Sequence, residues 1–315
     1  MKAALLHKPY EICVEDVEDP KIGPEDVLLE QVHTGICGSD VNRYKGIKEM
    51  GEPVYPIILG HEMAGVVAKV GEKVKGFQPG DRVWGINFQS LTQYYSAPQS
   101  KLFKLPDGIP LEHAQSLGPL GGTLHAIHVA GIQIGYTVAV IGPGHAGLVL
   151  TQWAKIAGAD RVITVGTRDS RLRIAQELGT DFTINTRKED PVKRVKEITG
   201  GSGVDVVIEA AGRPEAVKQA MEMIKTDGTI VIYGLGQEPV DGFDIFSVYR
   251  KRMKIIGTQG RTDRERETVV RYLASGKISL KPIISHVLPL EETKRGFEIV
   301  DQRLDDAIRV VIKSD

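Results

Sequence analysis

Cysteine is scarce in this sequence. Only two cysteines, Cys13 and Cys37, occur among the 315 residues, which excludes a disulfide-stapled scaffold and any metal site of four thiolates. Apolar runs long enough to cross a bilayer are also absent, and charges interrupt the N-terminal segment too early for a signal peptide. We therefore expect a cytoplasmic protein without a membrane partner.

An excess of charge of either sign is missing as well. Lys and Arg total 40 and Asp and Glu total 41, so the formal net charge is −1. Proteins that bind polyanions usually carry a basic excess, so we expect no nucleic-acid partner. The length exceeds that of one average domain and predicts two domains.

The pattern of apolar residues changes near residue 111. Upstream, short β-leaning runs separated by Pro and Gly predict a compact, antiparallel-rich barrel or sandwich. A helical segment follows, interrupted at Gly118, Pro119 and the glycine pair 121–122. Beyond it, strands expected at 137–142, 161–166, 204–212 and 229–234 alternate with helices expected at 146–158, 170–179 and 214–228. This alternation predicts a parallel sheet covered by helices on both faces, and a mixed pattern resumes after about residue 257.

The strand expected at 137–142 ends in a glycine-rich turn that contains Gly142, Gly144, His145, Ala146 and Gly147. Gly-x-Gly-x-x-Gly between a strand and a helix is the dinucleotide fingerprint. Its glycines permit a tight turn, close approach to a pyrophosphate and close helix packing, and the helix N-terminus attracts phosphate. We expect this turn to bind a nicotinamide dinucleotide; the alternative is a turn without a ligand.

The end of the next strand bears on the choice between NAD and NADP. An acidic residue there would bind the ribose diol of NAD, but Gly166 is followed by Thr167 and Arg168. A guanidinium can pair with a 2′-phosphate that no carboxylate repels, so NADP is favoured over NAD. The alternative is that Asp169 binds the ribose and Arg168 is a solvated charge.

Ala211 and Gly234 end two later strands of the series. The carboxyl ends of parallel strands face the cofactor crevice. We therefore expect the backbone at these two positions to contact the nicotinamide half of the dinucleotide.

Three potential metal ligands, Cys37, His61 and Glu62, lie in the β-rich part. Thiolate, imidazole and carboxylate suit Zn2+ and leave one position open for a substrate, whose oxygen the metal would polarise. Asp40 is a candidate acceptor for the second imidazole nitrogen of His61, and Ser39 is a candidate to hold the substrate hydroxyl proton. Adjacent strand residues face opposite ways, so Glu62 reaches the same metal only where the chain is irregular. The alternative is that Cys37 is a small buried apolar residue.

Together these segments resemble the medium-chain dehydrogenase/reductase superfamily, in particular its zinc-containing alcohol and polyol dehydrogenases. The stretch GHEMAGVVAKVGEKV at 60–74 resembles the family's zinc signature, and GICGSD, GDRV, the glycine turn and ASGKISLKPIISHVLPLEE also resemble family segments in the family's order. The resemblance spans the whole chain. It implies an α/β fold in which a GroES-like β-rich catalytic domain, residues 1–123 plus 258–315, carries an inserted Rossmann domain, residues 124–257, with a doubly wound parallel sheet.

The resemblance further implies one catalytic zinc held by Cys37, His61 and Glu62, and a homodimer or homotetramer. The sequence departs from the family pattern in three places. The lobe that commonly holds a structural zinc is replaced by the stretch INFQSL at 86–91, so no structural zinc is expected. Gly118 stands where the family often has Glu or Cys near the zinc, which predicts weaker zinc retention. Asn42 stands where a proton-relay His is frequent, and an amide cannot serve as acid or base near neutral pH.

The expected activity is reversible hydride transfer between NADP(H) and a secondary alcohol or ketone, with a polyol or sugar derivative as the small-molecule substrate. Two alternatives stay open. One is a zinc-free NADPH-dependent quinone or enone reductase of the same fold. The other is a non-catalytic NADP(H)-binding protein, because a fold does not fix a function.

Overall fold

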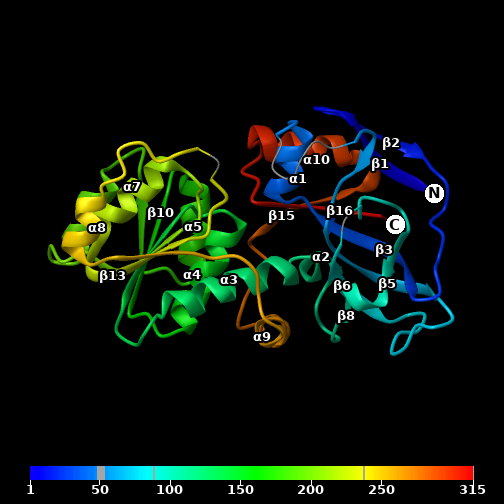
Figure 1. Cartoon of the computed structure of the whole chain (residues 1–315), viewed down its shortest axis with the longest axis horizontal. Coiled ribbons are helices and arrows are strands. Elements are labelled where there is room, and N and C mark those ends of the chain that lie inside the picture. The colour runs from blue at the N-terminus through cyan, green and yellow to red at the C-terminus, as the bar shows by residue number, and fades with distance from the viewer. Residues whose placement is uncertain (48–53, 88, 237, 315) are drawn as a thin grey trace. The chain divides into compact units, whose positions relative to one another are not determined.

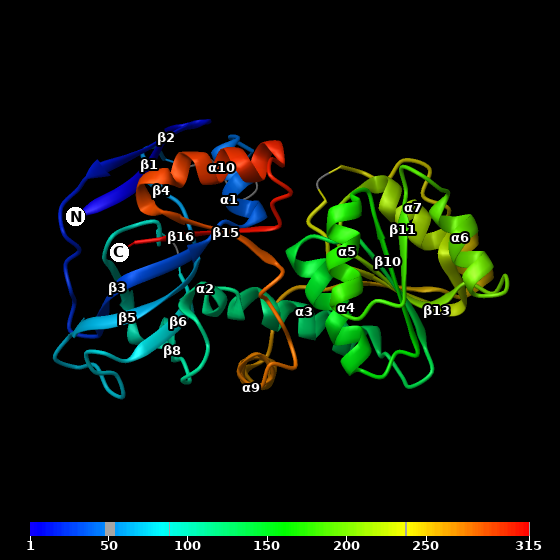
Figure 2. The same cartoon turned by 180° about the vertical axis from the view of Figure 1, so that it is seen from behind.

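The chain forms two compact units, which Figures 1 and 2 show from opposite sides. The computed structural model describes residues 1–47, 54–87, 89–236 and 238–314. The first unit comprises Met1–Pro119, Val270–Ser275 and Leu280–Asp315, and the second comprises Leu120–Val269 with Gly276–Ser279. These boundaries differ from the expected ones at 123/124 and 257/258. The chain first passes from one unit to the other inside the helix α3 (Leu117–Ala130), and it returns inside the helix α9 (Asp263–Ala274), before the short segment Gly276–Ser279 of the second unit.

The first unit is built mainly on antiparallel strand pairs, as its short apolar runs predict, and its β15 and β16 pair in parallel. Its larger sheet has the order β15-β16-β3-β5-β6-β8 with β7 on β3, and its smaller sheet has the order β2-β1-β4. Its strands are β1 (Lys2–Lys8), β2 (Glu11–Asp16), β3 (Asp26–Gly35), β4 (Ile57–Ile58), β5 (Glu62–Val70), β6 (Arg82–Ile86), β7 (Tyr95–Pro98), β8 (Leu102–Lys104), β15 (Ile284–Pro289) and β16 (Arg309–Lys313). Its helices are α1 (Gly38–Tyr44), α2 (Leu111–Ala114) and α10 (Thr293–Gln302).

The second unit is a doubly wound parallel sheet. Its strand order is β11-β10-β9-β12-β13-β14, and each adjacent pair is parallel. The strands are β9 (Thr137–Ile141), β10 (Arg161–Gly166), β11 (Phe182–Asn185), β12 (Val204–Glu209), β13 (Ile224–Ile232) and β14 (Lys254–Gly257). The helices between them are α4 (His145–Ile156), α5 (Asp169–Glu177), α6 (Pro191–Ile198), α7 (Pro214–Met223) and α8 (Ile245–Lys251). The order reverses between β9 and β12, where open sheets of this type bind their ligands.

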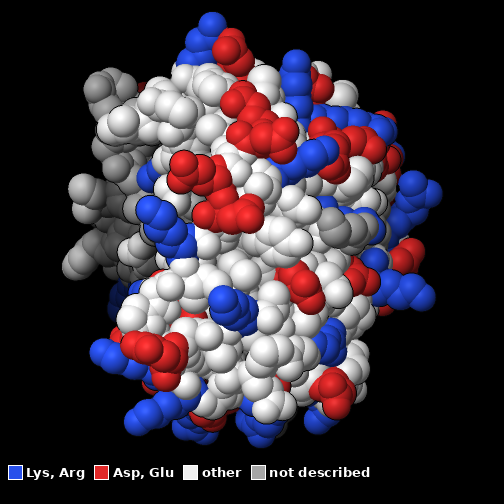
Figure 3. Space-filling model, turned by 90° about the vertical axis from the view of Figure 1, so that its right-hand side faces the viewer, with Lys and Arg blue, Asp and Glu red and all other residues white. Residues whose placement is uncertain are grey.

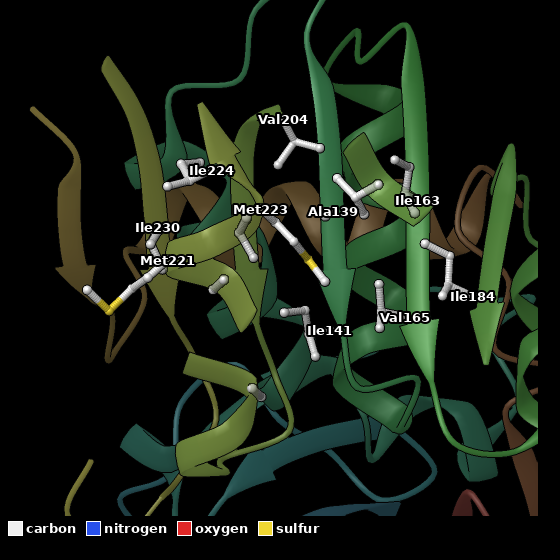
Figure 4. Packing of buried hydrophobic residues seen from close by; sticks show 14 of the residues in the cluster. Ala139, Ile141, Ile163, Val165, Ile184, Val204, Met221, Met223, Ile224 and Ile230 are labelled. Atoms are coloured by element: carbon white, nitrogen blue, oxygen red, sulfur yellow. The ribbon is translucent and has the colours of Figure 1, made fainter. Parts of the chain in front are cut away.

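A continuous apolar core holds this parallel sheet to its helices. Ala139, Ile163 and Ile230 on the strands are fully buried, and they belong to one cluster with Met221 and Met223 of α7 (Figure 4). β-Branched residues dominate these strands because both faces of the sheet are covered. The packing fixes the strand ends, on which the glycine turn is mounted.

The helical segment that begins at residue 111 does not break at its glycines, contrary to the prediction. It runs as α2 and then as α3, which begins at Leu117 and continues through the glycine pair 121–122. Pro119 lies in the first turn of α3, where an N–H has no intrahelical acceptor. Pro119 therefore does not interrupt α3, because it lies in the first turn of this helix.

None of the helices that the structure describes has the length and apolar character required to cross a bilayer. On the face shown in Figure 3, Lys and Arg side chains are interspersed with Asp and Glu. This mixture agrees with the balanced charge of the sequence.

Candidate metal and coenzyme sites

The fold brings the three predicted metal ligands together at one end of β5. Cys37 precedes α1, His61 precedes β5, and Glu62 is the first residue of that strand. One ligand atom from each lies within 4.8 Å of the other two. Gly60 has φ +89°, so the chain is not extended before His61. His61 itself lies outside β5, so the rule that neighbouring strand residues face opposite ways does not apply to the pair His61 and Glu62.

Asp40 orients the imidazole of His61. Its Oδ1 lies 3.2 Å from Nδ1 of His61 and accepts a hydrogen bond from the Gly60 N–H at 3.0 Å. Its Oδ2 accepts the N–H of Cys37 at 3.0 Å. One buried carboxylate thereby ties the segments that carry two of the ligands, and it leaves Nε2 of His61 to face Glu62, whose Oε1 is 3.8 Å away.

Arg309 on β16 joins this cluster, although the sequence analysis did not single it out. Its guanidinium is 4% exposed and donates to Oε2 of Glu62. It also donates to the Ile36 carbonyl at 3.0 Å and, through Nε, to Oε1 of buried Gln115 at 3.2 Å. The signal was present, because an arginine interrupts the apolar run AIRVVIK. This pairing leaves Oε1 of Glu62 as the oxygen nearest His61.

The cluster carries an excess of negative charge around His61. Burial by itself would lower the pKa of this imidazole. The hydrogen bonds with Asp40 and Cys37 and the charges of Asp40 and Glu62 outweigh burial and raise the pKa to about 11. An environment that holds a proton so strongly is also suited to a dication, and sulfur, nitrogen and oxygen donors in this set suit Zn2+. The residues present therefore fit the metal that the sequence pattern implies.

The remaining residues singled out around this site lie on α1 and at the start of α3. Ser39 and Asn42 are both partly exposed on α1. Gly118 lies at the start of α3, and a Cβ there would be 2.3 Å from Cδ1 of Ile86. An acidic or thiol side chain at residue 118 would therefore require Ile86 to move. Phe88, within the shortened lobe, lies outside the described residues.

The glycine-rich turn has the backbone geometry that a dinucleotide requires. Gly142 has φ +100°, a region that side chains disfavour. A Cβ at Gly147 would lie 2.0 Å from the Gly142 carbonyl oxygen, whereas a Cβ at Gly144 would meet nothing within 4 Å. His145 and Ala146 open α4, and Gly144 is its N-cap. The free N–H groups of the first turn thus follow the loop directly.

Arg168 and Asp169 follow the end of β10, and the carboxylate of Asp169 is hydrogen-bonded to nearby side chains. Arg168 follows Gly166 and Thr167 and is the N-cap of α5. The carboxylate of Asp169 accepts from Nζ of Lys188 at 2.6 Å and from Nδ2 of Asn185 at 2.8 Å. Lys188 and then Asn185 lower the pKa of Asp169. Asp169 is therefore already paired with two donors from the segment around the end of β11.

Ala211 follows β12, and Gly234 follows β13. In the sheet β12 lies next to β9, which carries the glycine turn, and β13 lies next to β12. A Cβ at Gly142 would lie 2.8 Å from the Ala211 nitrogen, so the two loops are in close backbone contact. The structure therefore brings the predicted coenzyme residues after β9 and β12 side by side, with Gly234 following the neighbouring β13.

Two further histidines, His125 and His128, have a local structural role. Both lie on α3, and their Nδ1 atoms are 3.0 and 2.7 Å from the same oxygen of Glu265 on α9. Glu265 is 3% exposed, and its other oxygen accepts the Thr262 N–H. The spacing of three residues places both imidazoles on one helix face, where both reach Glu265.

A parallel doubly wound sheet with a glycine turn at its switch point, in a chain that also has a β-rich unit with a cysteine–histidine–glutamate cluster, defines a metal- and dinucleotide-dependent class of dehydrogenase. Family comparison identifies the class. Residues 23–107 match the alcohol dehydrogenase GroES-like domain, and residues 146–275 match the zinc-binding dehydrogenase domain. The chain belongs to the zinc-type alcohol dehydrogenases of the medium-chain superfamily and is an NAD(P)-dependent oxidoreductase of CH–OH groups.

Relatives of known name include several polyol dehydrogenases. The chain is 32% identical to D-arabitol-phosphate dehydrogenase of Enterococcus avium, over 95% of this chain and 93% of that protein. It is 31% identical to sorbitol dehydrogenase of Rattus norvegicus, over 99% and 95%, and 32% identical to L-threonine 3-dehydrogenase of Bacillus licheniformis, over 94% and 95%. A zinc-binding dehydrogenase structure from Sinorhizobium meliloti, bound to NADP, has a TM-score of 0.89 and 28% identity, over 99% and 98% of the two chains.

Proposed function

We propose that this protein is an NADP(H)-linked dehydrogenase of secondary alcohols, with a polyol or sugar derivative as substrate and one zinc ion held by Cys37, His61 and Glu62. The donor cluster carries the proposal, because Asp40 and Arg309 hold a thiolate, an imidazole and a carboxylate around one point. With only two cysteines in the sequence, a second zinc site of four thiolates has no ligands.

The residues of the chain then have separate roles in the reaction. When bound, zinc would polarise the substrate oxygen, and NADP+ would accept the hydride. Asp40 keeps Nε2 of His61 directed at the metal position, and Arg309 holds the side chain of Glu62 in place. Ser39, on the first turn of α1, is the hydroxyl proposed to receive the substrate proton. Asn42 cannot relay it by acid–base chemistry.

The coenzyme preference rests on the end of β10. Arg168 supplies the charge for a 2′-phosphate, and the pairing of Asp169 with Lys188 and Asn185 reduces its repulsion. The NADP in the related Sinorhizobium meliloti structure supports the same choice.

Metal analysis combined with a substrate panel tests the proposal. We expect about one zinc per chain and NADP+ reduction with polyols, sugar alcohols or their phosphates. L-Threonine belongs in the panel because one relative acts on it. Metal-free protein with full activity on a quinone or enone would instead identify a reductase of the same fold. NADPH binding without turnover of any substrate would favour a binding protein.

A homodimer or homotetramer is proposed as the assembled form, with α8 in the interface. Ile245, Phe246 and Tyr249 on α8 are 74%, 66% and 79% exposed, and β14 forms one edge of the parallel sheet. Exposed apolar side chains beside a sheet edge are suited to self-association. Sedimentation of Phe246→Ser should show a smaller species, whereas Ile134→Ser, an isolated residue that is 92% exposed, should sediment as wild type.

A further inference from the structure

Glu209 is a fully buried carboxyl group at the centre of the proposed coenzyme site. It ends β12, beside the point where the strand order reverses, and its exposed fraction is 0%. Its position is unlike that of a core residue, because the loop that follows it is open to solvent at Ala211. Burial of a carboxyl group costs free energy unless the group is hydrogen-bonded, so the burial of Glu209 beneath this loop requires compensating interactions.

The side chain of Glu209 folds back on its own loop. Oε1 accepts hydrogen bonds from the Ala211 N–H at 2.7 Å and the Gly212 N–H at 2.8 Å. Its backbone carbonyl accepts the N–H groups of Tyr233 and Gly234, both at 2.9 Å. One residue therefore joins the loops after β12 and β13.

The loops around Glu209 are packed backbone against backbone. A Cβ at Gly234 would lie 2.2 Å from the Gly212 nitrogen and 2.8 Å from Oε2 of Glu209, and a Cβ at Gly142 would lie 2.8 Å from the Ala211 nitrogen. Within the described part of the chain, Oε2 accepts no hydrogen bond. Burial raises the pKa of this carboxyl, although the backbone donors oppose the effect. The hydrogen bonds that Oε1 accepts from Ala211 and Gly212 are therefore the directional contacts of the Glu209 side chain.

We propose that Glu209 is a positioning residue, whose Oε1 holds the Ala211–Gly212 backbone in the arrangement that receives the nicotinamide half of the coenzyme. The inference rests on the proposed coenzyme function and adds to it. The glycine turn and Arg168 serve the pyrophosphate and the adenosine half, so removing the Glu209 acceptor should affect only one half of the ligand.

Calorimetric binding of NADP+ and of its adenosine half, adenosine 2′,5′-bisphosphate, tests this division. Glu209→Leu keeps apolar bulk without the acceptor, and we expect NADP+ affinity to fall about tenfold, as loss of two hydrogen bonds implies. Affinity for the bisphosphate should stay within about twofold. Glu209→Gln keeps an acceptor oxygen and should restore most of the NADP+ affinity.

Equal losses for both ligands, equal losses in the Gln and Leu variants, or no loss would each overturn the inference. If the wild-type protein binds neither NADP+ nor NAD+, the proposed coenzyme function itself fails. If Glu209→Leu does not give a cooperative thermal transition, Gly234→Ala replaces it, because its Cβ would displace the same loop. Gly257→Ala, where a Cβ meets nothing within 4 Å, is the matched control and should bind both ligands as wild type.

Discussion

The two candidate sites are built from different parts of the polypeptide. In the first unit, side chains of Cys37, His61 and Glu62 converge, and Asp40 and Arg309 hold them. In the second unit, backbone groups at strand ends form the site, and glycines let the loops approach. The first kind of site depends on chemical identity, whereas the second depends on the absence of side chains. Substitutions should therefore damage the two sites in separable ways.

The largest effect is expected from Cys37→Ala, which removes one of three metal ligands. Bound zinc should fall well below one per chain, and kcat/KM should fall about a thousandfold or more because substrate polarisation is lost. NADP+ affinity should change less than about twofold, since that site uses the other unit. Metal analysis, steady-state kinetics and calorimetry measure the three quantities. Cys13→Ala, at an exposed free thiol, should match wild type; retained zinc and activity in Cys37→Ala would refute the ligand assignment.

The next effect is expected from Arg309→Met, which leaves the buried carboxylate of Glu62 without its counter-ion. Breaking a buried pair on one side costs about 3–5 kcal/mol, so the free energy of unfolding in urea should fall by that amount. Zinc retention should weaken as well. Arg295→Met breaks a pair with Glu292 whose arginine is 60% exposed, and it should cost less than about 1 kcal/mol. If both variants lost the same free energy of unfolding, the buried Arg309–Glu62 pair would contribute no more to stability than an exposed pair.

A smaller and more selective effect is expected from Arg168→Ala in the second unit. The ratio of kcat/KM for NADP+ to that for NAD+ should fall about tenfold or more, because a charged partner of the 2′-phosphate is lost. Zinc content should not change. Arg194→Ala, at an exposed residue paired with Glu197, serves as control. A wild-type preference for NAD+, or an unchanged ratio in Arg168→Ala, would refute the NADP assignment.

The smallest effect concerns stability in acid through Glu265. Burial by itself raises the pKa of this carboxyl, but hydrogen bonds from Thr262, His128 and His125 lower the pKa to about 2. Because the folded-state pKa is depressed, the stabilisation is present above about pH 5 and is lost as the pH falls towards 2. The urea concentrations at which wild type and Glu265→Gln are half unfolded should differ above about pH 5 and converge as the pH falls towards 2. Glu298→Gln, at a weak surface pair, should run parallel to wild type instead.

Much of the fold could be predicted from local patterns. The apolar β-branched runs and the Gly142 turn gave the parallel sheet, because periodicity and glycine spacing are properties of the chain itself. The short strands β11 and β14 were missed because four-residue runs carry little periodicity. The break expected at Gly118 and Pro119 was wrong because Pro119 lies in the first turn of α3, a position that composition does not reveal.

Sequence by itself determined the ingredients of this protein: the family, the two-part plan, the glycine turn and three residues with donor atoms suited to zinc. Residue type and spacing fix these because they are local. Only the tertiary structure decided the rest: that Arg309, 247 residues from Glu62 in the sequence, pairs with it, that Asp169 is held by Lys188, and that Glu209 lies beneath the coenzyme loop. The Arg309–Glu62 pair joins segments far apart in the sequence, and burial strengthens it, so it arises only when packing removes both groups from water. Asp169 and Lys188 meet because they follow β10 and β11, which pair in parallel.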